Sequence, residues 1–201
     1  METARQQEIL DRTLELVRES GLAGLTIRKI AERVGFTEAA VYRHFPSKRA
    51  LLAGLVRRLD GILLEPIRAL AGDRGRSPRK RLEEALAHHQ RVILETDSLP
   101  ILLLAEVVAT GDTELVGAMR RVLAEYLGLL GGMIREARER EGVESDLPPG
   151  LANLLLLGVP AALAIRHRLL PGDDPAPEAL AVLTEKAVTV AIGLDQPEET
   201  P

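Results

Sequence analysis

The chain has 201 residues, of which 46% are hydrophobic and 28% charged, and its formal net charge is −4 at pH 7. This composition is typical of one or two globular domains and argues against a disordered chain. The absence of cysteine excludes disulfides, thiolate nucleophiles and cysteine-based metal sites.

Charge is divided unevenly along the chain. Residues 1–60 contain 11 basic and 8 acidic residues, whereas the remainder contains 15 basic and 22 acidic residues. A nucleic-acid surface is therefore expected at the N-terminal end. The N-terminus lacks the apolar segment of a secretory signal, and the apolar run at residues 151–165 is interrupted and shorter than the roughly 20 residues of a membrane span. We expect no membrane span and a cytoplasmic location.

Residues 3–20 are predicted to form the first helix. Thr3 is a candidate N-cap, apolar residues recur at helical spacing on one face, and Gly21 is typical of a helix end. This helix is expected to cover the back of the segment that follows.

Residues 25–51 predict two short helices joined by a glycine turn and followed by the start of a third. Thr26 is a candidate N-cap, and the apolar residues after it recur at helical spacing as far as Gly35, which favours a helix end. Thr37 then caps a second helix of about two turns, which Pro46 ends. Two short helices around such a turn are typical of a helix-turn-helix.

The second short helix is expected to bury Val41 and Phe45 and to present its other side chains outward. A helix of this length is marginal in water, so packing must hold it. Three of the four aromatic residues of the chain lie between residues 26 and 49, together with six basic and only two acidic residues. A local basic surface on an acidic protein indicates a phosphate backbone as partner.

This segment resembles the DNA-binding domain of the TetR family of bacterial transcriptional repressors. The resemblance implies an all-α fold of about nine helices. Its N-terminal three-helix domain, with the helix-turn-helix, would span residues 1–46, and a C-terminal helical domain for ligand binding and dimerisation would span residues 47–201. The matching residues are Leu25-Thr26, Ile30-Ala31, Val34-Gly35, Val41-Tyr42-Arg43-His44-Phe45, Ser47-Lys48 and Ala50-Leu51.

The resemblance also implies that the helix starting at Glu38 enters the major groove of double-stranded DNA, whose width matches one helix. Chemistry suggests that Arg43 donates to guanine, and Lys48 lies at a helix N-terminus, where it can bind phosphate. The predicted DNA-binding residues are Thr26, Arg28, Thr37, Glu38, Ala39, Ala40, Tyr42, Arg43, His44 and Lys48.

Two of these residues have alternative interpretations. An acid in the first turn of a helix stabilises the helix dipole without any partner, so base contact and dipole stabilisation carry equal weight for Glu38. His44 alternatively caps the end of the short helix.

N-cap residues, glycines and prolines predict the boundaries of the helices that follow. Gly61 and Pro66 are expected bend points in the helix that begins after Ser47. Asp112 is the expected N-cap of a long amphipathic helix that Gly142 ends. We predict helices over residues 47–70, 78–96, 101–110 and 112–141, with a polar linker at residues 72–78 and a break at residues 97–100.

The last two predicted helices indicate a homodimer. Residues 151–170 are apolar nearly all round, and residues 176–194 place apolar side chains at alternating steps of three and four. Both helices would expose much apolar surface in a monomer, so a four-helix bundle with a second copy is favoured over burial within one chain. A dimer places two recognition helices about 34 to 36 Å apart, which predicts a palindromic operator.

The resemblance further implies a small-molecule effector in the C-terminal domain. Glu106 is the strongest candidate contact, because a buried carboxylate must find a partner or water. Each candidate is alternatively a surface residue or an interhelical hydrogen-bonding residue. The predicted ligand-binding residues are His88, Arg91, Glu106, Tyr126 and Asn153, and His89 and Arg120 belong to the same group of polar residues in apolar helices.

We therefore predict a dimeric transcriptional regulator, a repressor that a small-molecule effector releases from a palindromic operator. The alternative is a helix-turn-helix protein that is anchored on DNA and binds a protein partner through its C-terminal domain. An enzyme is disfavoured, because no nucleophile setting, phosphate loop or metal-ligand spacing is recognisable. Adjacent His88 and His89 point about 100° apart on a helix, so no metal site is expected, and no cofactor either.

Overall fold

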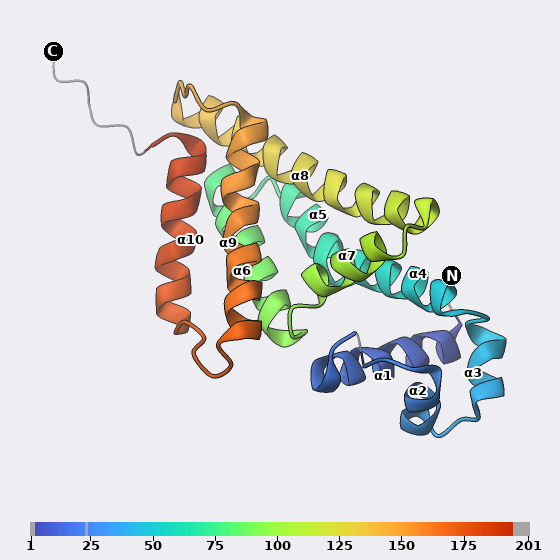
Figure 1. Cartoon of the computed structure of the whole chain (residues 1–201). Coiled ribbons are helices and arrows are strands. Elements are labelled where there is room, and N and C mark those ends of the chain that lie inside the picture. Colours follow the sequence, from blue (N-terminus) through green and yellow to red (C-terminus); the bar gives the residue numbers. More distant parts are fainter. Residues whose placement is uncertain (1–2, 23, 195–201) are drawn as a thin grey trace, which may run out of the picture.

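The computed structural model describes residues 3–22 and 24–194, and this part of the chain is helical without a β-strand (Figure 1). The predicted all-α fold is confirmed. Residues 1, 2, 23 and 195–201, which the predicted domain ranges include, lie outside the described residues. The elements are α1 (Ala4–Ser20), α2 (Ile27–Val34), α3 (Glu38–His44), α4 (Lys48–Leu59), η1 (Asp60–Leu64), α5 (Glu65–Gly72), α6 (Pro78–Glu95), α7 (Leu99–Ala109), α8 (Thr113–Glu141), α9 (Pro149–Leu169) and α10 (Pro177–Ile192).

Side-chain caps set the boundaries of the N-terminal helices. The hydroxyl oxygens of Thr26, Thr37 and Ser47 each accept a hydrogen bond from the backbone N–H of the third residue of α2, α3 and α4. Gly35 ends α2 with a φ of 76°, a left-handed conformation that costs glycine no Cβ clash. These four boundaries are confirmed as the sequence predicted them.

The helix that follows Ser47 continues through α4, η1 and α5 to Gly72. Its irregular part is η1, five π-helical residues directly before α5, which has Pro66 in its first turn. Proline has no N–H to donate, and a π-helical turn is one way for a helix to absorb the missing bond. The irregularity thus lies at the predicted bend points. Counted as one helix, this segment brings the described part of the chain to nine helices.

α4 connects the helix-turn-helix to the rest of the molecule. It contacts α1 on one side and α7 and α8 on the other, while α6 forms the centre of the C-terminal domain and contacts α8, α9 and α10 (Figure 1). One buried apolar cluster extends from Ile9 in α1 to Ile192 in α10. The two ends of the chain therefore share a continuous core, and a domain boundary at residue 46 stays a prediction.

α9 (Pro149–Leu169) agrees with the helix predicted at residues 151–170. Its residues Gly150–Leu169 have a mean hydropathy of 1.4 and are long and apolar enough to cross a membrane by length and composition alone. The apolar run at residues 151–165 is thus part of a longer helix, which continues through Pro160. The core helix of a soluble protein meets the same criterion, and α9 packs against α6, α8 and α10.

Exposed apolar side chains gather on the last two helices, which lie side by side at the edge of the molecule away from α3 (Figure 1). Among the described residues, 14 large hydrophobic side chains are exposed, and ten of these lie on or directly after α9 and α10. The ten are Leu151, Leu154, Leu155, Ile165, Leu169, Leu170, Val182, Leu183, Val190 and Leu194.

Candidate DNA-binding surface and apolar cavity

α3 divides into a buried and an outward side as predicted. Val41 and Phe45 are 0% and 2% exposed. The other side chains of α3 point outward to different degrees, and whether they contact DNA stays a prediction. Glu38, Ala39, Tyr42 and Arg43 are exposed, whereas Ala40 and His44 are half-buried.

The C-terminal end of α3 is held from two sides. An added Cβ at Gly54 of α4 would lie 3.0 Å from Phe45 Cε1 and 2.9 Å from Leu10 Cδ2, so the Phe45 ring packs directly on the α4 backbone. From α1, Gln6 Nε2 donates a hydrogen bond to the backbone oxygen of His44 at 3.2 Å. These contacts fix the orientation of a helix that is too short to be stable alone.

The predicted phosphate contacts on α2 have few competing partners. The Thr26 hydroxyl caps α2 and remains exposed. Arg28 Nε donates to Glu32 Oε1 at 2.9 Å, but both side chains are largely exposed, with 77% and 62% of their surface accessible. An ion pair in this setting contributes little stability, so the guanidinium is free to exchange its partner.

Two ion-pair groups tie the start of α4 to the C-terminal domain. Lys48 Nζ lies 2.6 Å from Glu106 Oε1 of α7. Arg49 Nε donates to Asp112 Oδ2 at 2.5 Å, and the same guanidinium contacts Glu114. The structure therefore joins a residue predicted for phosphate contact to one predicted for effector contact.

Asp112 has a double role at this junction. Its carboxylate caps α8 by accepting hydrogen bonds from the backbone N–H groups of Glu114 and Leu115, at 3.0 and 2.9 Å, and it also accepts from Arg49. The Leu115 N–H first, and then the Arg49 guanidinium, hold the pKa of Asp112 below its usual range. The carboxylate thus stays charged at neutral pH.

An apolar cavity of about 170 Å³ lies inside the C-terminal domain. Side chains from α4, η1, α6, α7, α8 and α9 line it, and all are apolar except His89 and Tyr126. α7 contributes Pro100, Ile101 and Leu104 to its wall.

His89 and Tyr126 form the polar pair of this cavity. His89 Nδ1 lies 2.9 Å from the Tyr126 hydroxyl, and the two rings meet edge to face with centroids 5.0 Å apart. Burial lowers the pKa of His89 to about 3 and raises the pKa of Tyr126. Both groups are therefore uncharged at neutral pH.

Of the five predicted ligand-binding residues, Tyr126 alone lines this cavity. His88 Nε2 bonds to the backbone oxygen of Ile62 at 3.0 Å, and Glu106 pairs with Lys48. Asn153 is buried, and its Nδ2 donates to the backbone oxygen of Leu127 at 2.9 Å.

His89 was named with the polar residues in apolar helices as a candidate for the pocket but was left out of the five predicted ligand-binding residues, although its spacing carries a signal. Counting along α6, Leu82, Leu86, His89 and Ile93 follow at steps of four, three and four, which places all four on one face of the helix. All four are buried. The position of His89 within this apolar stripe indicates a buried histidine, whereas His88 lies outside the stripe.

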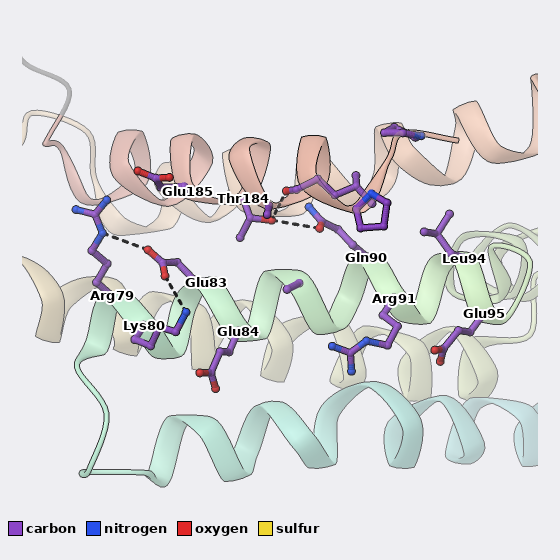
Figure 2. Close-up of a pocket in the computed structure, with 15 residues that line it drawn as sticks. Arg79, Lys80, Glu83, Glu84, Gln90, Arg91, Leu94, Glu95, Thr184 and Glu185 are labelled. Atoms are coloured by element: carbon purple, nitrogen blue, oxygen red, sulfur yellow. Dashed lines mark hydrogen bonds and ion pairs between the residues drawn. The ribbon is translucent and has the colours of Figure 1, made fainter. Parts of the chain in front are cut away.

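A wider and more open groove of about 760 Å³ lies between α6 and α10 (Figure 2). Three of its charged side chains pair with one another, since Glu83 lies 3.3 Å from Arg79 and 3.5 Å from Lys80. Arg91, the fifth predicted ligand-binding residue, lines this groove rather than the cavity. Several charged side chains line the groove, whereas no charged side chain of the described residues lines the cavity, so the cavity is the better site for an apolar molecule.

Comparison with known proteins identifies the family. The model of bacterial regulatory proteins of the tetR family matches residues 9–55. The nucleoid occlusion factor SlmA of Shewanella sp. (strain W3-18-1) is 31% identical over 160 residues, which cover 76% of this chain and 77% of that protein.

Solved structures share the fold. The FadR regulator of Bacillus subtilis in complex with stearoyl-CoA has a TM-score of 0.73 and 19% identity, covering 93% of this chain and 97% of that chain. A TetR/AcrR-family regulator of Thermobifida fusca has a TM-score of 0.70 and 25% identity, covering 97% of this chain and 100% of that chain. Together with the helix-turn-helix geometry, these matches establish that the chain belongs to the TetR family of bacterial DNA-binding regulatory proteins.

Proposed function

We propose that this protein is a cytoplasmic, dimeric repressor that binds a palindromic operator through α3 and leaves it when a small molecule occupies the apolar cavity. The observation that carries this proposal is the double role of α7. Pro100, Ile101 and Leu104 of α7 line the cavity, and Glu106 of the same helix holds Lys48 at the start of α4. A shift of α7 caused by a ligand would therefore reach the start of α4, which follows α3 directly in the chain.

Recognition of DNA is assigned to α3 and its flanks. Arg43 and Glu38 are exposed on the helix that would enter the major groove, where a guanidinium pairs with guanine and a carboxylate accepts from cytosine. Thr26, Arg28, Tyr42 and Lys48 surround it with phosphate donors. Phosphate contacts would position the helix, and Arg43 would select the base.

The dimer is assigned to the exposed apolar surface of α9 and α10. On α9, Leu151, Leu155, Ile165 and Leu169 recur on one face at helical spacing and are exposed. An apolar surface of this kind is typical of an interface. Pairing with the same surface of a second copy makes a two-fold contact, which favours a palindromic operator.

Control by a ligand requires that the ligand binds the two arrangements of the dimer with different affinity. A coupling free energy of about 1 to 3 kcal/mol changes DNA affinity roughly 5- to 150-fold. The FadR structure, which has a similar fold, was determined with stearoyl-CoA. This supports a ligand-controlled regulator without identifying the ligand of this chain.

The proposal is tested by selecting genomic fragments that the purified protein binds and then screening small molecules for release of the protein from them. We expect enriched fragments with two inverted half-sites, and at least one compound that weakens binding to them. A protein that binds all duplexes equally at moderate salt would contradict the proposal.

A second candidate function is a DNA-anchored adaptor that binds a protein partner through the C-terminal domain. It is favoured by the relatives that cover three quarters of the chain, because these are named nucleoid occlusion factors rather than transcriptional regulators. Deleting the gene and comparing transcripts separates the two. Changed expression beside the bound sites supports the repressor, whereas bound sites without changed transcripts support the adaptor.

A further inference from the structure

We infer that the effector of the proposed repressor is a small uncharged molecule with an apolar body of about one ring, whose single polar group faces the His89–Tyr126 pair. This inference rests on the function proposed above and adds the chemical class of the ligand. Three properties of the cavity carry it, namely its charge, its size and its one polar position.

The cavity offers no partner for a charged ligand. Among the residues that the structure describes, no Asp, Glu, Lys or Arg side chain lines it. Its two titratable groups are both more than nine-tenths buried and uncharged at neutral pH. A carboxylate or an ammonium group that entered would lose its hydration without gaining a counter-charge, which is strongly unfavourable. Ionised ligands are therefore excluded.

The volume of the cavity limits the ligand to about one ring. An apolar cavity of about 150 Å³ accommodates benzene, and this one measures about 170 Å³. Leu104 and Leu123 line the cavity and are also 38% and 37% exposed, so they lie where the cavity meets the surface. A long acyl chain exceeds this volume and would have to extend past these leucines into solvent, whereas a single ring fits within the cavity.

The His89–Tyr126 pair supplies one donor and one acceptor whichever tautomer is present. If the Tyr126 hydroxyl donates to Nδ1, the Nε2–H of His89 is left as a donor and the phenol oxygen as an acceptor. In the other tautomer Nδ1–H donates, so Nε2 accepts and the hydroxyl donates. Nε2 makes no hydrogen bond within the described residues. A ligand hydroxyl or carbonyl group can therefore be satisfied here.

The experiment uses the full-length protein and four probes, namely toluene, phenol, benzoate and decanoate. Calorimetry measures binding, and fluorescence anisotropy with the selected operator measures release. Ala161→Phe fills the cavity, and Ala105→Phe is its matched control, because Ala161 lines the cavity whereas Ala105 is an exposed residue of α7. Tyr126→Phe removes the hydroxyl from the polar pair. Thermal unfolding of each variant checks that it is folded.

We expect toluene and phenol to bind and benzoate and decanoate not to bind. Phenol should lose roughly 3- to 10-fold in affinity in Tyr126→Phe, the effect of one hydrogen bond, while toluene is unaffected. Ala161→Phe should abolish the binding of toluene and of phenol, and Ala105→Phe should bind both as the wild-type protein does. If Ala161→Phe does not fold, a competition experiment replaces it. Saturating toluene should then displace phenol, because both ligands are expected to occupy the same cavity.

The outcomes separate this inference from the proposed function. Binding of benzoate or decanoate in the cavity, with release of the operator, would contradict the inferred ligand class but support the proposed repressor. Binding of phenol and toluene that leaves operator affinity unchanged would support the ligand class and contradict the effector control. Equal affinity of phenol for the wild-type protein and Tyr126→Phe would contradict a hydrogen bond between the ligand and the His89–Tyr126 pair.

Discussion

In the proposed function Lys48 connects DNA affinity to the C-terminal domain, because an operator phosphate would compete with the carboxylate of Glu106 for its Nζ. Glu106→Gln removes this competitor, so DNA binding should become tighter by up to about 5-fold, the scale of a surface ion pair. Anisotropy with one operator duplex measures the change. Glu185→Gln on α10 is the control, and a loss of affinity in Glu106→Gln would show that the carboxylate instead positions Lys48 for phosphate.

Lys48 and Arg43 should differ in what their loss does to specificity. Lys48→Ala is expected to weaken binding to all duplexes alike and to lower the slope of log affinity against log salt by about one. Arg43→Ala should cost about 1 to 3 kcal/mol and relax the preference at one base pair. Binding to cognate and random duplexes over a salt series measures both effects. Identical losses on both kinds of DNA in both variants would contradict these roles.

His89 makes the stability of the protein depend on pH. Its pKa falls from 6.5 to about 3 on burial, so between these values the unfolded chain binds a proton that the folded chain does not. The free energy of unfolding is therefore highest, as far as His89 is concerned, above pH 6.5. It decreases on acidification, by about 2 kcal/mol at pH 5. The pKa of His88 is also lowered by burial and acts in the same direction.

Urea unfolding at pH 5 and pH 8 measures this dependence. The wild-type protein should lose clearly more stability on acidification than His89→Gln, in which the titrating ring is absent. The same pH dependence in both proteins would rule out His89 as its source.

At the scale of the element, the packing of Phe45 sets the orientation of α3. This ring is 2% exposed and packs on the backbone at Gly54. Phe45→Ala should lower the free energy of unfolding by about 3 to 5 kcal/mol and weaken operator binding, because the cavity it leaves releases the end of the helix. Denaturant unfolding measures the loss. A change below about 1 kcal/mol would mean that Phe45 is not a core residue.

Several helix boundaries could be predicted because their causes are local, whereas α7 begins at Leu99 without a side-chain cap, inside the break predicted at residues 97–100. Thr26, Thr37, Ser47, Ser77 and Asp112 each cap the helix that follows, through hydrogen bonds that span three residues or fewer. Such bonds depend only on neighbours in the sequence, so residue type and spacing suffice to locate them.

The candidate site depended on long-range packing and was therefore only partly predictable. Glu106 was selected for its apolar neighbours in sequence, yet its partner Lys48 comes from a distant helix. The cavity takes its lining from five α-helices and η1, and no local pattern reveals which side of each helix faces it. Tyr126 was selected, like the other candidates, as a polar group among apolar neighbours in sequence, and it is the one of the five predicted residues that lines the cavity.

At the scale of the whole molecule, the exposed apolar surface of α9 and α10 predicts a dimer. Leu155 on α9 and Leu183 on α10 are 42% and 45% exposed in the single chain. Leu155→Glu with Leu183→Glu should give a folded monomer with weakened operator binding, since a buried carboxylate pair disfavours the interface. Sedimentation measures the mass. Val108→Glu, on an exposed position of α7, is the control and should stay dimeric.

The central claim is that two copies of α3 are held one turn of DNA apart. It is tested most directly by inserting about five base pairs between the half-sites of the selected operator, which turns one half-site to the opposite face of the duplex. The account predicts that affinity falls toward that of a single half-site and is regained when about ten base pairs are inserted. Equal affinity for the original and the half-turn duplex would contradict it.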